Sequence, residues 1–404
     1  MKRHYYLNKI HKLMDTEEIK IITGVRRSGK THLLKEIIKK LQEKGIPKEN
    51  IIYISLESNK HRKICKEEDL SKLIFQLTKN IENKIYLLLD EIHRVENWEE
   101  AINKFKINLN SDIYITSSNS KLLSDINTTP LSRYIQLKIH PFSYKEILQY
   151  HKENGETIDY KKEIEIYNEY LNFGGFPGLL KYEKDEKLDY LSDIYASIIL
   201  KDIMSLNKIG SIDLFSRLME FMISNIGKIL SANSISKHLK SKHQKISPST
   251  VVDYLKHSIN AFIFYNVKRE DLKNENMLKT FEKYYIADPG FYHIFNPENK
   301  RDTEYLLENI IFLELLQRNY EITIGKIKDF EVDFVCRKYG QKIYIQVAES
   351  IADLNTKKRE LYPFEKIKDN FPKYIITTDI IDYSNNGIKH INILDFLKAD
   401  DNDF

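Results

Sequence analysis

Residues Ile19–Lys40 read IKIITGVRRSGKTHLLKEIIKK and contain the most informative motif of the chain. Its apolar start indicates a buried strand, and apolar residues three and four positions apart after Thr31 are typical of a helix. Between the two lies G-x-x-x-x-G-K-T over residues 24–31, a phosphate-binding loop in its strand–loop–helix context. Its glycines let backbone N–H groups curl around a phosphate, and the helix N-terminus adds partial positive charge. We therefore expect a nucleoside triphosphate to bind here.

The loop also predicts which side chains contact the nucleotide. Lys30 is expected to bridge the β- and γ-phosphates, and the hydroxyl of Thr31 is expected to hold Mg²⁺. We expect ATP, because the guanine-reading N/T-K-x-D pattern is not apparent in the chain. The residues predicted to bind the nucleotide are Gly24, Val25, Arg26, Arg27, Ser28, Gly29, Lys30, Thr31 and His32.

A second motif follows about sixty residues downstream of Lys30, where IYLLLDE spans 85–91. A continuous apolar run is typical of a buried parallel strand, and ligands bind at the carboxyl edge of such sheets. Asp90 is expected to orient Mg²⁺, and Glu91 to polarise the attacking water. The alternative for Glu91 is a solvated acid in a loop.

Two further residues are predicted to assist hydrolysis. The strand ending at Thr116 runs into Ser-Ser-Asn, and Asn119 is the first choice for a sensor of the γ-phosphate or the water, with Ser118 second. An ordinary cap or turn is the alternative for both. Arg133 precedes the alternating strand 135–139 and would neutralise transition-state charge, either in cis or in a neighbouring subunit. A surface salt bridge is the alternative for Arg133.

Length and composition limit the class of protein. A chain of 404 residues predicts two to four domains, and 42% apolar with 30% charged residues indicates a globular protein. The net charge of +4 does not by itself argue for nucleic acid. Cys65 and Cys336 lie far apart without metal-type spacing, which favours reduced thiols. No apolar signal core and no run of about 18 apolar residues is present, so we expect a cytoplasmic protein without a membrane partner.

Taken together, ITGVRRSGKT, LLLDEIHRVENWE, ITSSNSKLL, LSRYI and HPFSYKEIL resemble the AAA-family ATPases of bacteria and archaea that carry a C-terminal domain of unknown function. The resemblance continues through YLNFGGFP and YASIILKDI and covers nearly the whole chain. It implies an α/β fold with four parts. These are an AAA+ P-loop core with a parallel sheet over 1–150, a helical lid over 151–208, a winged-helix module over 209–298, and a small α/β domain resembling the PD-(D/E)xK nuclease fold over 299–404.

The residues of the third part fit this plan. Ser247–Thr250 is a helix cap with proline near the helix start, opening a helix over Val251–Ile259, and Ala261–Val267 follows as a strand. Basic and aromatic residues cluster here and would meet the phosphates of DNA: Lys237, His238, Lys240, Lys242, His243, Lys245, Tyr254, Lys256 and His257. Docking of a protein partner remains an equal alternative.

The fourth part carries an incomplete nuclease pattern. Cleavage of this type needs a helix acid, a strand Asp and a nearby (E/Q)-x-K, in which the acids hold Mg²⁺ and the lysine positions the water. Asp333 and Gln346 match, with Glu314 or Glu308 as the helix acid, but the lysine position is Ala348. A fold kept for structure or binding is therefore favoured over a nuclease.

The leading hypothesis is a Mg²⁺-dependent ATPase whose nucleotide state switches the C-terminal modules, with DNA as one expected partner. Gly174–Pro177 (GGFP) is expected between lid helices, where nucleotide state would change the geometry; a tight helix–helix turn is the alternative. The second hypothesis is a nucleotide-gated interaction protein with little turnover and a protein partner. The third, an ATP-dependent nuclease, is disfavoured by Ala348.

Overall fold

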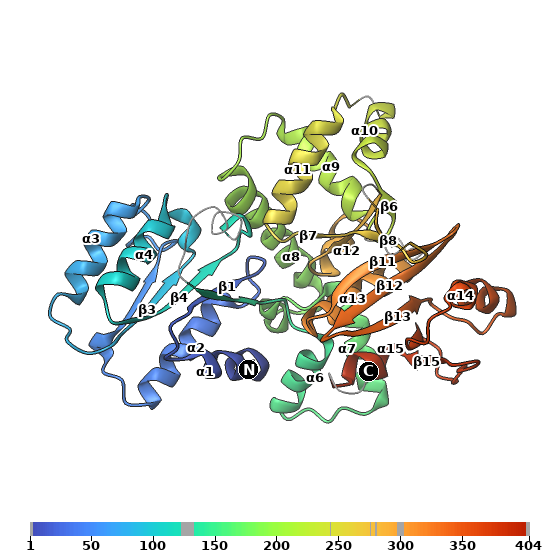
Figure 1. Ribbon diagram of the computed structural model, residues 1–404, viewed down its shortest axis with the longest axis horizontal. Helices are drawn as coiled ribbons and strands as arrows, with labels where there is room; N and C mark the ends of the chain where they lie inside the picture. The colour runs from blue at the N-terminus through green and yellow to red at the C-terminus, as the bar shows by residue number, and fades with distance from the viewer. Residues whose placement is uncertain are drawn as a thin grey trace. The chain divides into compact units, whose positions relative to one another are not determined.

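The computed structural model describes residues 3–122, 133–242, 244–274, 276–278, 281–296 and 303–400. The chain forms two compact units, the first made of Met1–Pro141 with Asn260–Phe262, and the second made of Phe142–Ile259 with Ile263–Phe404 (Figure 1). Helix α6 (Tyr144–Glu153) therefore lies in the second unit, although the sequence grouped it with the first part of the chain. The division into four parts stays a proposal.

The first unit is built on a five-stranded sheet in the order β2-β3-β4-β1-β5. Every neighbouring pair is parallel, so all the strands end at one edge. The central strands are buried at every position, which is why they read as continuous apolar runs. The strands are β1 (Ile19–Thr23), β2 (Ile51–Ser55), β3 (Ile85–Asp90), β4 (Ser111–Ser117) and β5 (Tyr134–Lys138).

Helices cover both faces of this sheet (Figure 1). Because successive strand residues point to opposite faces, Ile22 packs with α1 and α2 on one side, and Ile21 packs with α3 and α4 on the other. Two short 3₁₀ turns, η1 and η2, complete the unit. The bounds are α1 (His4–Leu13), α2 (Lys30–Glu43), α3 (Glu67–Thr78), α4 (Trp98–Asn108), η1 (Lys48–Asn50) and η2 (Ile92–Arg94).

The second unit begins with helices. Ser143 opens the first of them with a capping box, in which its side chain accepts from the backbone of Glu146 and the Glu146 side chain accepts in return. α12 packs against α7, α8 and α9. The helical segments are α6 (Tyr144–Glu153), α7 (Tyr160–Phe173), η3 (Pro177–Lys181), α8 (Lys184–Ile198), the π-helical η4 (Ile199–Met204) and α12 (Gly290–Phe295).

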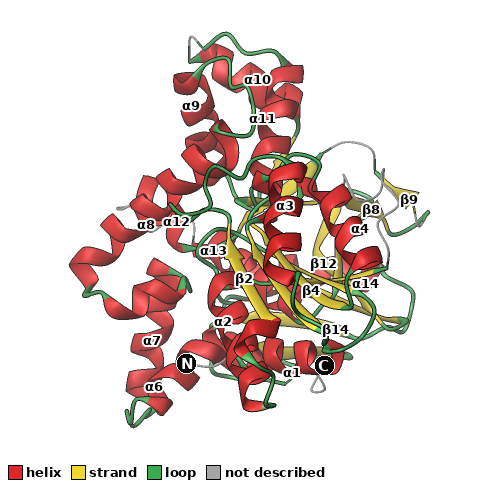
Figure 2. Ribbon diagram, turned by 90° about the vertical axis from the view of Figure 1, so that its left-hand side faces the viewer, coloured by secondary structure: helices red, strands yellow, loops and turns green. Residues whose placement is uncertain are grey.

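Three further helices cluster together in the same unit (Figure 2) and precede a small antiparallel sheet in the order β6-β10-β7. The expected helix and strand are both present, although the strand begins at Phe264 rather than Ala261. The bounds are α9 (Ile212–Ile223), β6 (Ile229–Leu230), α10 (Ala232–Ser241), α11 (Pro248–Asn260), β7 (Phe264–Val267) and β10 (Glu282–Ile286).

A seven-stranded mixed sheet forms the rest of the second unit, in the order β15-β14-β13-β12-β11-β8-β9. β8 pairs in parallel with β11, so strands from before residue 298 belong to the sheet expected over 299–404. No helix in the described ranges has the length and apolarity needed to cross a bilayer. The strands are β8 (Arg269–Asp271), β9 (Asn276–Met277), β11 (Glu321–Ile327), β12 (Phe330–Lys338), β13 (Gln341–Val347), β14 (Lys373–Thr377) and β15 (Ile388–Asn392), and the helices are α13 (Thr303–Gln317), α14 (Leu354–Lys366) and α15 (Ile393–Lys398).

Candidate nucleotide site

The loop between β1 and α2 closes on itself around a lysine. Lys30 Nζ donates to the carbonyl oxygens of Gly24 at 2.9 Å and Val25 at 3.2 Å. Gly24 has φ +150°, and a Cβ there would lie 2.0 Å from the carbonyl oxygen of Ile139, so only glycine fits. Gly29 has φ +106° and directly precedes the first turn of α2. The loop therefore places a buried ammonium group beside the helix N-terminus.

The polar groups of the loop fit a chain of phosphates. The hydroxyl of Ser28 is buried and has no hydrogen-bond partner among the described residues. A phosphate oxygen would satisfy this hydroxyl, as it would the N–H groups of the helix start. Arg27, at φ +69°, and His32, in the first turn of α2, are both exposed. The nucleotide-binding residues predicted from the sequence thus lie together in one loop and one helical turn.

Asp90, at the end of β3, is surrounded by hydroxyl groups. Its Oδ2 accepts from Thr31 Oγ1 at 2.8 Å and from Tyr53 OH at 3.2 Å, and its Oδ1 accepts from Thr116 Oγ1 at 2.6 Å. Burial and the nearby charge of Glu91 raise the pKa of Asp90, while the hydrogen bonds from Thr116 and Thr31 oppose this effect. The two predicted Mg²⁺ ligands, Thr31 and Asp90, are therefore in direct contact.

Glu91 is buried, with 6% of its surface exposed and φ +59°, so it is not a solvated loop acid. Its Oε2 accepts from the backbone N of Ser118 at 2.9 Å and from Ser118 Oγ at 3.0 Å. Lys30 Nζ lies 3.5 Å from Oε1, and His93 Nδ1 lies 3.3 Å from Oε2. Burial alone would raise the pKa of Glu91, but Lys30, His93 and Arg26 outweigh it and lower the pKa to about 2. Glu91 is thus a fixed, ionised acceptor.

The sensor prediction falls on two residues with different contacts. Ser118 holds Glu91, whereas Asn119 Oδ1 accepts from the backbone N of Lys121 at 2.8 Å, the contact of an ordinary turn. Sequence reasoning missed Tyr53 and His93. The sequence gives little indication of either residue. Tyr53 looks like an ordinary strand residue, and the position of His93 depends on the conformation of the turn after Glu91.

Comparison with known proteins identifies the family of this chain. Residues 16–148 match an AAA domain, and residues 164–302 match a domain of unknown function. An uncharacterized protein of Haemophilus influenzae is 36% identical over 403 residues, covering 98% of both chains. The chain belongs to the AAA+ family of P-loop ATPases. MJ1544 of Methanocaldococcus jannaschii is 30% identical over 94% of this AAA+ chain and 85% of its own.

A solved structure shares the fold. The Walker-type ATPase of Pyrococcus abyssi superposes with a TM-score of 0.50 over 73% of this chain and 95% of its own, at 17% identity. The parallel sheet and phosphate loop described above are those of the AAA+ P-loop fold.

Arg133 does not reach this site in cis. It is exposed, and its carbonyl accepts from the backbone N of Ile19 at 3.0 Å, at the amino end of β1. The phosphate loop follows Thr23, at the other end of the same strand. Five strand residues separate the two ends by about 16 Å. The expectation of a contact in cis is therefore wrong, and action on a neighbouring subunit stays a prediction.

A buried lysine from another sheet of the AAA+ chain lies among the acids for which the sequence predicted an incomplete nuclease pattern. Lys283 of β10 has its Nζ 3.1 Å from Glu308 Oε2, 2.6 Å from Glu331 Oε1 and 3.6 Å from Asp333 Oδ1. We call these four residues the acid–lysine cluster. Burial lowers the pKa of Lys283, but the carboxylates outweigh it and hold the pKa well above its usual value. Burial and Glu308 raise the pKa of Asp333.

Of the two helix acids expected from the sequence, Glu308 lies beside Lys283 together with Asp333, whereas Glu314 Oε1 accepts from Arg318 Nε at 2.8 Å. Gln346 Nε2 donates to Glu360 Oε2 at 3.0 Å, and its Oε1 accepts weakly from the backbone N of Asp333. In the described part of the chain no group of three or more His, Cys, Asp or Glu side chains is arranged to hold a metal ion. The acids are instead neutralised by Lys283.

In the basic cluster of the middle part, Tyr254 is buried, His257 is half-buried, and the other described members are exposed. Tyr254 is buried and its ring packs edge-on against Phe215, so it is a core residue rather than a base contact. His238 packs its ring on Phe221. His243 lies outside the described residues. The exposed lysines of this region are Lys237, Lys240, Lys242, Lys245 and Lys256.

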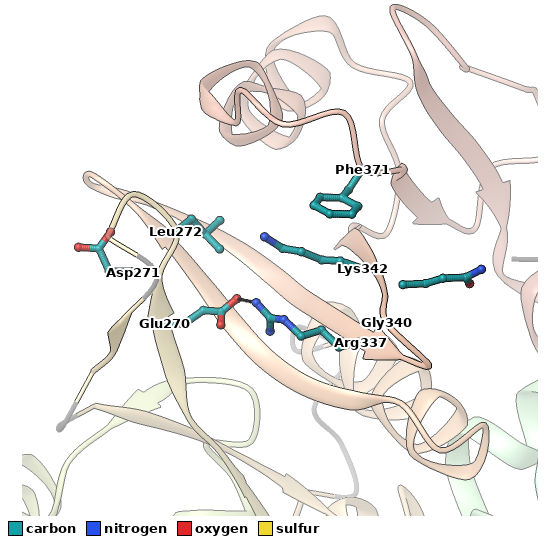
Figure 3. Close-up of a pocket in the computed structure, with 8 residues that line it drawn as sticks. Glu270, Asp271, Leu272, Arg337, Gly340, Lys342 and Phe371 are labelled. Atoms are coloured by element: carbon teal, nitrogen blue, oxygen red, sulfur yellow. Dashed lines mark hydrogen bonds and ion pairs between the residues drawn. The ribbon is translucent and has the colours of Figure 1, made fainter.

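A surface pocket of about 410 Å³ lies beside the β12–β13 hairpin (Figure 3). Arg337 Nη2 donates to Glu270 Oε1 at 2.8 Å within it. Lys342 points toward Phe371, with its Nζ 5.3 Å from the ring centre, and lies 3.5 Å from Asp369. Because both cations already face carboxylates, the pocket is not an obvious anion site.

Proposed function

We propose that this AAA+ protein hydrolyses ATP with the help of Mg²⁺, and that its nucleotide state switches the second unit. The observation that carries the proposal is the meeting of Lys30, Asp90 and Glu91 at one edge of the sheet, with Thr31 bonded to Asp90 and Ser118 bonded to Glu91. Such a set contains a phosphate-binding cation, a metal-ligand pair and a positioned carboxylate.

Each side chain then has a defined task. Lys30 exchanges the carbonyls of Gly24 and Val25 for phosphate oxygens, and Glu91 orients the water and receives its proton. Ser118 keeps the Glu91 carboxylate in place with two hydrogen bonds. Thr31 and Asp90 would hold Mg²⁺, which neutralises charge on the β- and γ-phosphates when bound.

Steady-state hydrolysis of wild type, Lys30→Ala and Glu91→Gln tests the proposal. We expect Glu91→Gln to lower turnover at least about a hundredfold while ATP binding is kept, and Lys30→Ala to weaken binding itself. Glu49→Gln, at an exposed position, is the matched control. Tight ATP binding without wild-type turnover would reject hydrolysis and leave the second candidate, a nucleotide-gated interaction protein.

We also propose that the helices α9, α10 and α11 with the sheet β6-β10-β7 form a winged-helix module that contacts DNA. The element order supports the module, and the five exposed lysines on and beside α10 and α11 support contact with phosphates. Binding of a labelled duplex should weaken steeply with salt, and Lys237→Ala together with Lys240→Ala should reduce the slope by about 2. ATP turnover that duplex DNA leaves unchanged would point to a protein partner instead.

A further inference from the structure

We propose that Arg26, within the phosphate loop, supplies in cis the positive charge that stabilises the transition state of ATP hydrolysis, and that Glu57 holds its guanidinium ready between turnovers. This inference rests on the hydrolysis proposed above. It assigns to the loop the cation that was expected at Arg133.

Arg26 is turned into the molecule. Only 6% of its surface is exposed, and its Nη1 donates to both carboxylate oxygens of Glu57, at 3.0 and 2.8 Å. Glu57 follows β2, whose last residue, Ser55, lies opposite Asp90 in the sheet register. Arg26 is therefore anchored at the carboxyl edge of the sheet, where Asp90 and Glu91 lie. An arginine that only kept the loop soluble would extend into water, as Arg27 does.

The carboxylate that holds the guanidinium also lies beside the turn that follows Glu91. Glu57 Oε1 is 3.8 Å from Nη1 of Arg94, the last residue of η2. Lys30, which donates to the Val25 carbonyl next to Arg26, marks the centre of the loop. A triphosphate wrapped by this loop and facing Glu91 would present its terminal phosphate to the region between Glu91 and Arg26.

The contact with Glu57 is easily exchanged. A carboxylate and a phosphate offer a guanidinium the same pair of acceptor oxygens, so Arg26 can pass from one to the other without losing its charge-assisted hydrogen bonds. Arg94 Nη1 lies 3.8 Å from Glu57 Oε1 and stays beside this carboxylate when Arg26 moves. Glu57 is partly exposed, at 28%, so the exchange leaves no buried uncompensated charge.

The step concerned is the displacement at the γ-phosphorus. The water oxygen bonds to phosphorus, and the bond to the β–γ bridging oxygen breaks with its electron pair going to ADP. The water proton passes through Glu91 to the released phosphate. Negative charge grows on the bridging and equatorial oxygens, and an arginine contact there is worth about 10³–10⁵ in kcat where it has been measured in other phosphoryl-transfer enzymes.

The test compares Arg26→Ala and Arg26→Lys with wild type in three measurements. These are kcat at saturating ATP, the affinity for the non-hydrolysable AMP-PNP, and the affinity for ADP with aluminium fluoride, which mimics the transition state. For Arg26→Ala we expect kcat and ADP–aluminium fluoride affinity to fall at least about a hundredfold, with AMP-PNP affinity within about fivefold of wild type. Arg26→Lys should recover part of both losses. Arg217→Ala, at an exposed position in the second unit, is the charge-matched control.

Equal losses in both affinities, or no loss in either, would overturn the inference. The fluorescence unfolding transition of Trp98, buried in the first unit, checks that the variants fold. If wild type does not hydrolyse ATP, the proposed function fails, but a selective loss of ADP–aluminium fluoride binding in Arg26→Ala still supports this role for Arg26. When made in the wild-type protein, Glu57→Gln should raise the affinity for AMP-PNP several-fold, because it releases Arg26. When made in the Arg26→Ala variant, the same substitution should leave this affinity unchanged. An unchanged affinity when Glu57→Gln is made in the wild-type protein would reject the role of Glu57.

Discussion

Replacing Lys283 by methionine should destabilise the second unit strongly. The side chain of Lys283 is 3% exposed and is the cation of the acid–lysine cluster, with carboxylates at 2.6, 3.1 and 3.6 Å. Methionine fills similar volume but leaves Glu308 and Asp333 buried without a partner charge. Removing one member of a buried ion pair costs about 3–5 kcal/mol of unfolding free energy, and we expect a loss in this range.

The two compact units allow this loss to be located. Trp98 is the one tryptophan of the chain and is buried in the first unit, so its fluorescence follows that unit alone, while far-UV circular dichroism follows both. In urea, Lys283→Met should shift the dichroism transition and leave the Trp98 transition in place. Lys20→Met is the reverse control, because the buried Lys20 Nζ lies 2.6 Å from Asp112 in the first unit.

The destabilisation caused by Lys283→Met should depend on pH. Loss of Lys283 raises the pKa of Asp333 and Glu308 further above their unfolded values, so stability is kept at low pH and lost as the pH rises. The defect should be smaller at pH 5 than at pH 8, and Asp333→Asn added to Lys283→Met should recover part of it. A loss below about 1 kcal/mol, or an equal shift of both transitions, would refute the reasoning.

Three other predictions concern single residues. Gly174→Ala should cost about 3 kcal/mol, because φ is +78° and a Cβ would lie 1.6 Å from Asp288 Oδ1, whereas Gly155→Ala, with φ +83° and open space, should cost about 1 kcal/mol in the same urea titration. Burial raises the pKa of Asp288 to about 7, so the protonated carboxyl contributes stability that is lost as the pH rises from about 4 through 7. Asp288→Asn should flatten this part of a plot of unfolding free energy against pH. A plot identical to that of wild type would contradict the prediction. Thr31→Ala should raise the Mg²⁺ concentration for half-maximal turnover about tenfold, and a turnover curve matching wild type would exclude Thr31 as a metal ligand.

The grouping of the candidate nucleotide-site residues could be predicted from the sequence because each half of the group is local. Residues 24–31 form one loop, and Asp90 with Glu91 end one strand, so reading the strand ends was enough to bring them together. The prediction that Arg133 contacts the site in cis failed because its position is not determined locally. Its placement depends on which end of β5 lies beside the phosphate loop, and that depends on the parallel register of β5 with β1, which no local pattern contains.

The C-terminal cluster could be predicted only in part. Asp333 and Glu308 were named from the PD-(D/E)xK pattern that the resemblance implies, but α13 is apolar all round, so its periodicity could not separate Glu308 from Glu314. Lys283 was missed because it enters from β10, a strand of a different sheet. The contact of Asp288 with the backbone N of Gly175 was missed likewise, since the two residues are 113 positions apart in the sequence.

The parallel pairing of β8 with β11 affects how the chain can be dissected. The match to the domain of unknown function ends at residue 302. The seven-stranded sheet, most of which follows this residue, also contains β8 and β9, which precede it. In a recombinant fragment beginning at Thr303, β11 would be an unpaired edge strand. The fragment would also carry the acids of the acid–lysine cluster without Lys283. Such a fragment should aggregate alone, and co-expression with residues 142–296 should restore it as a split protein. The two modules are thus expected to fold only together.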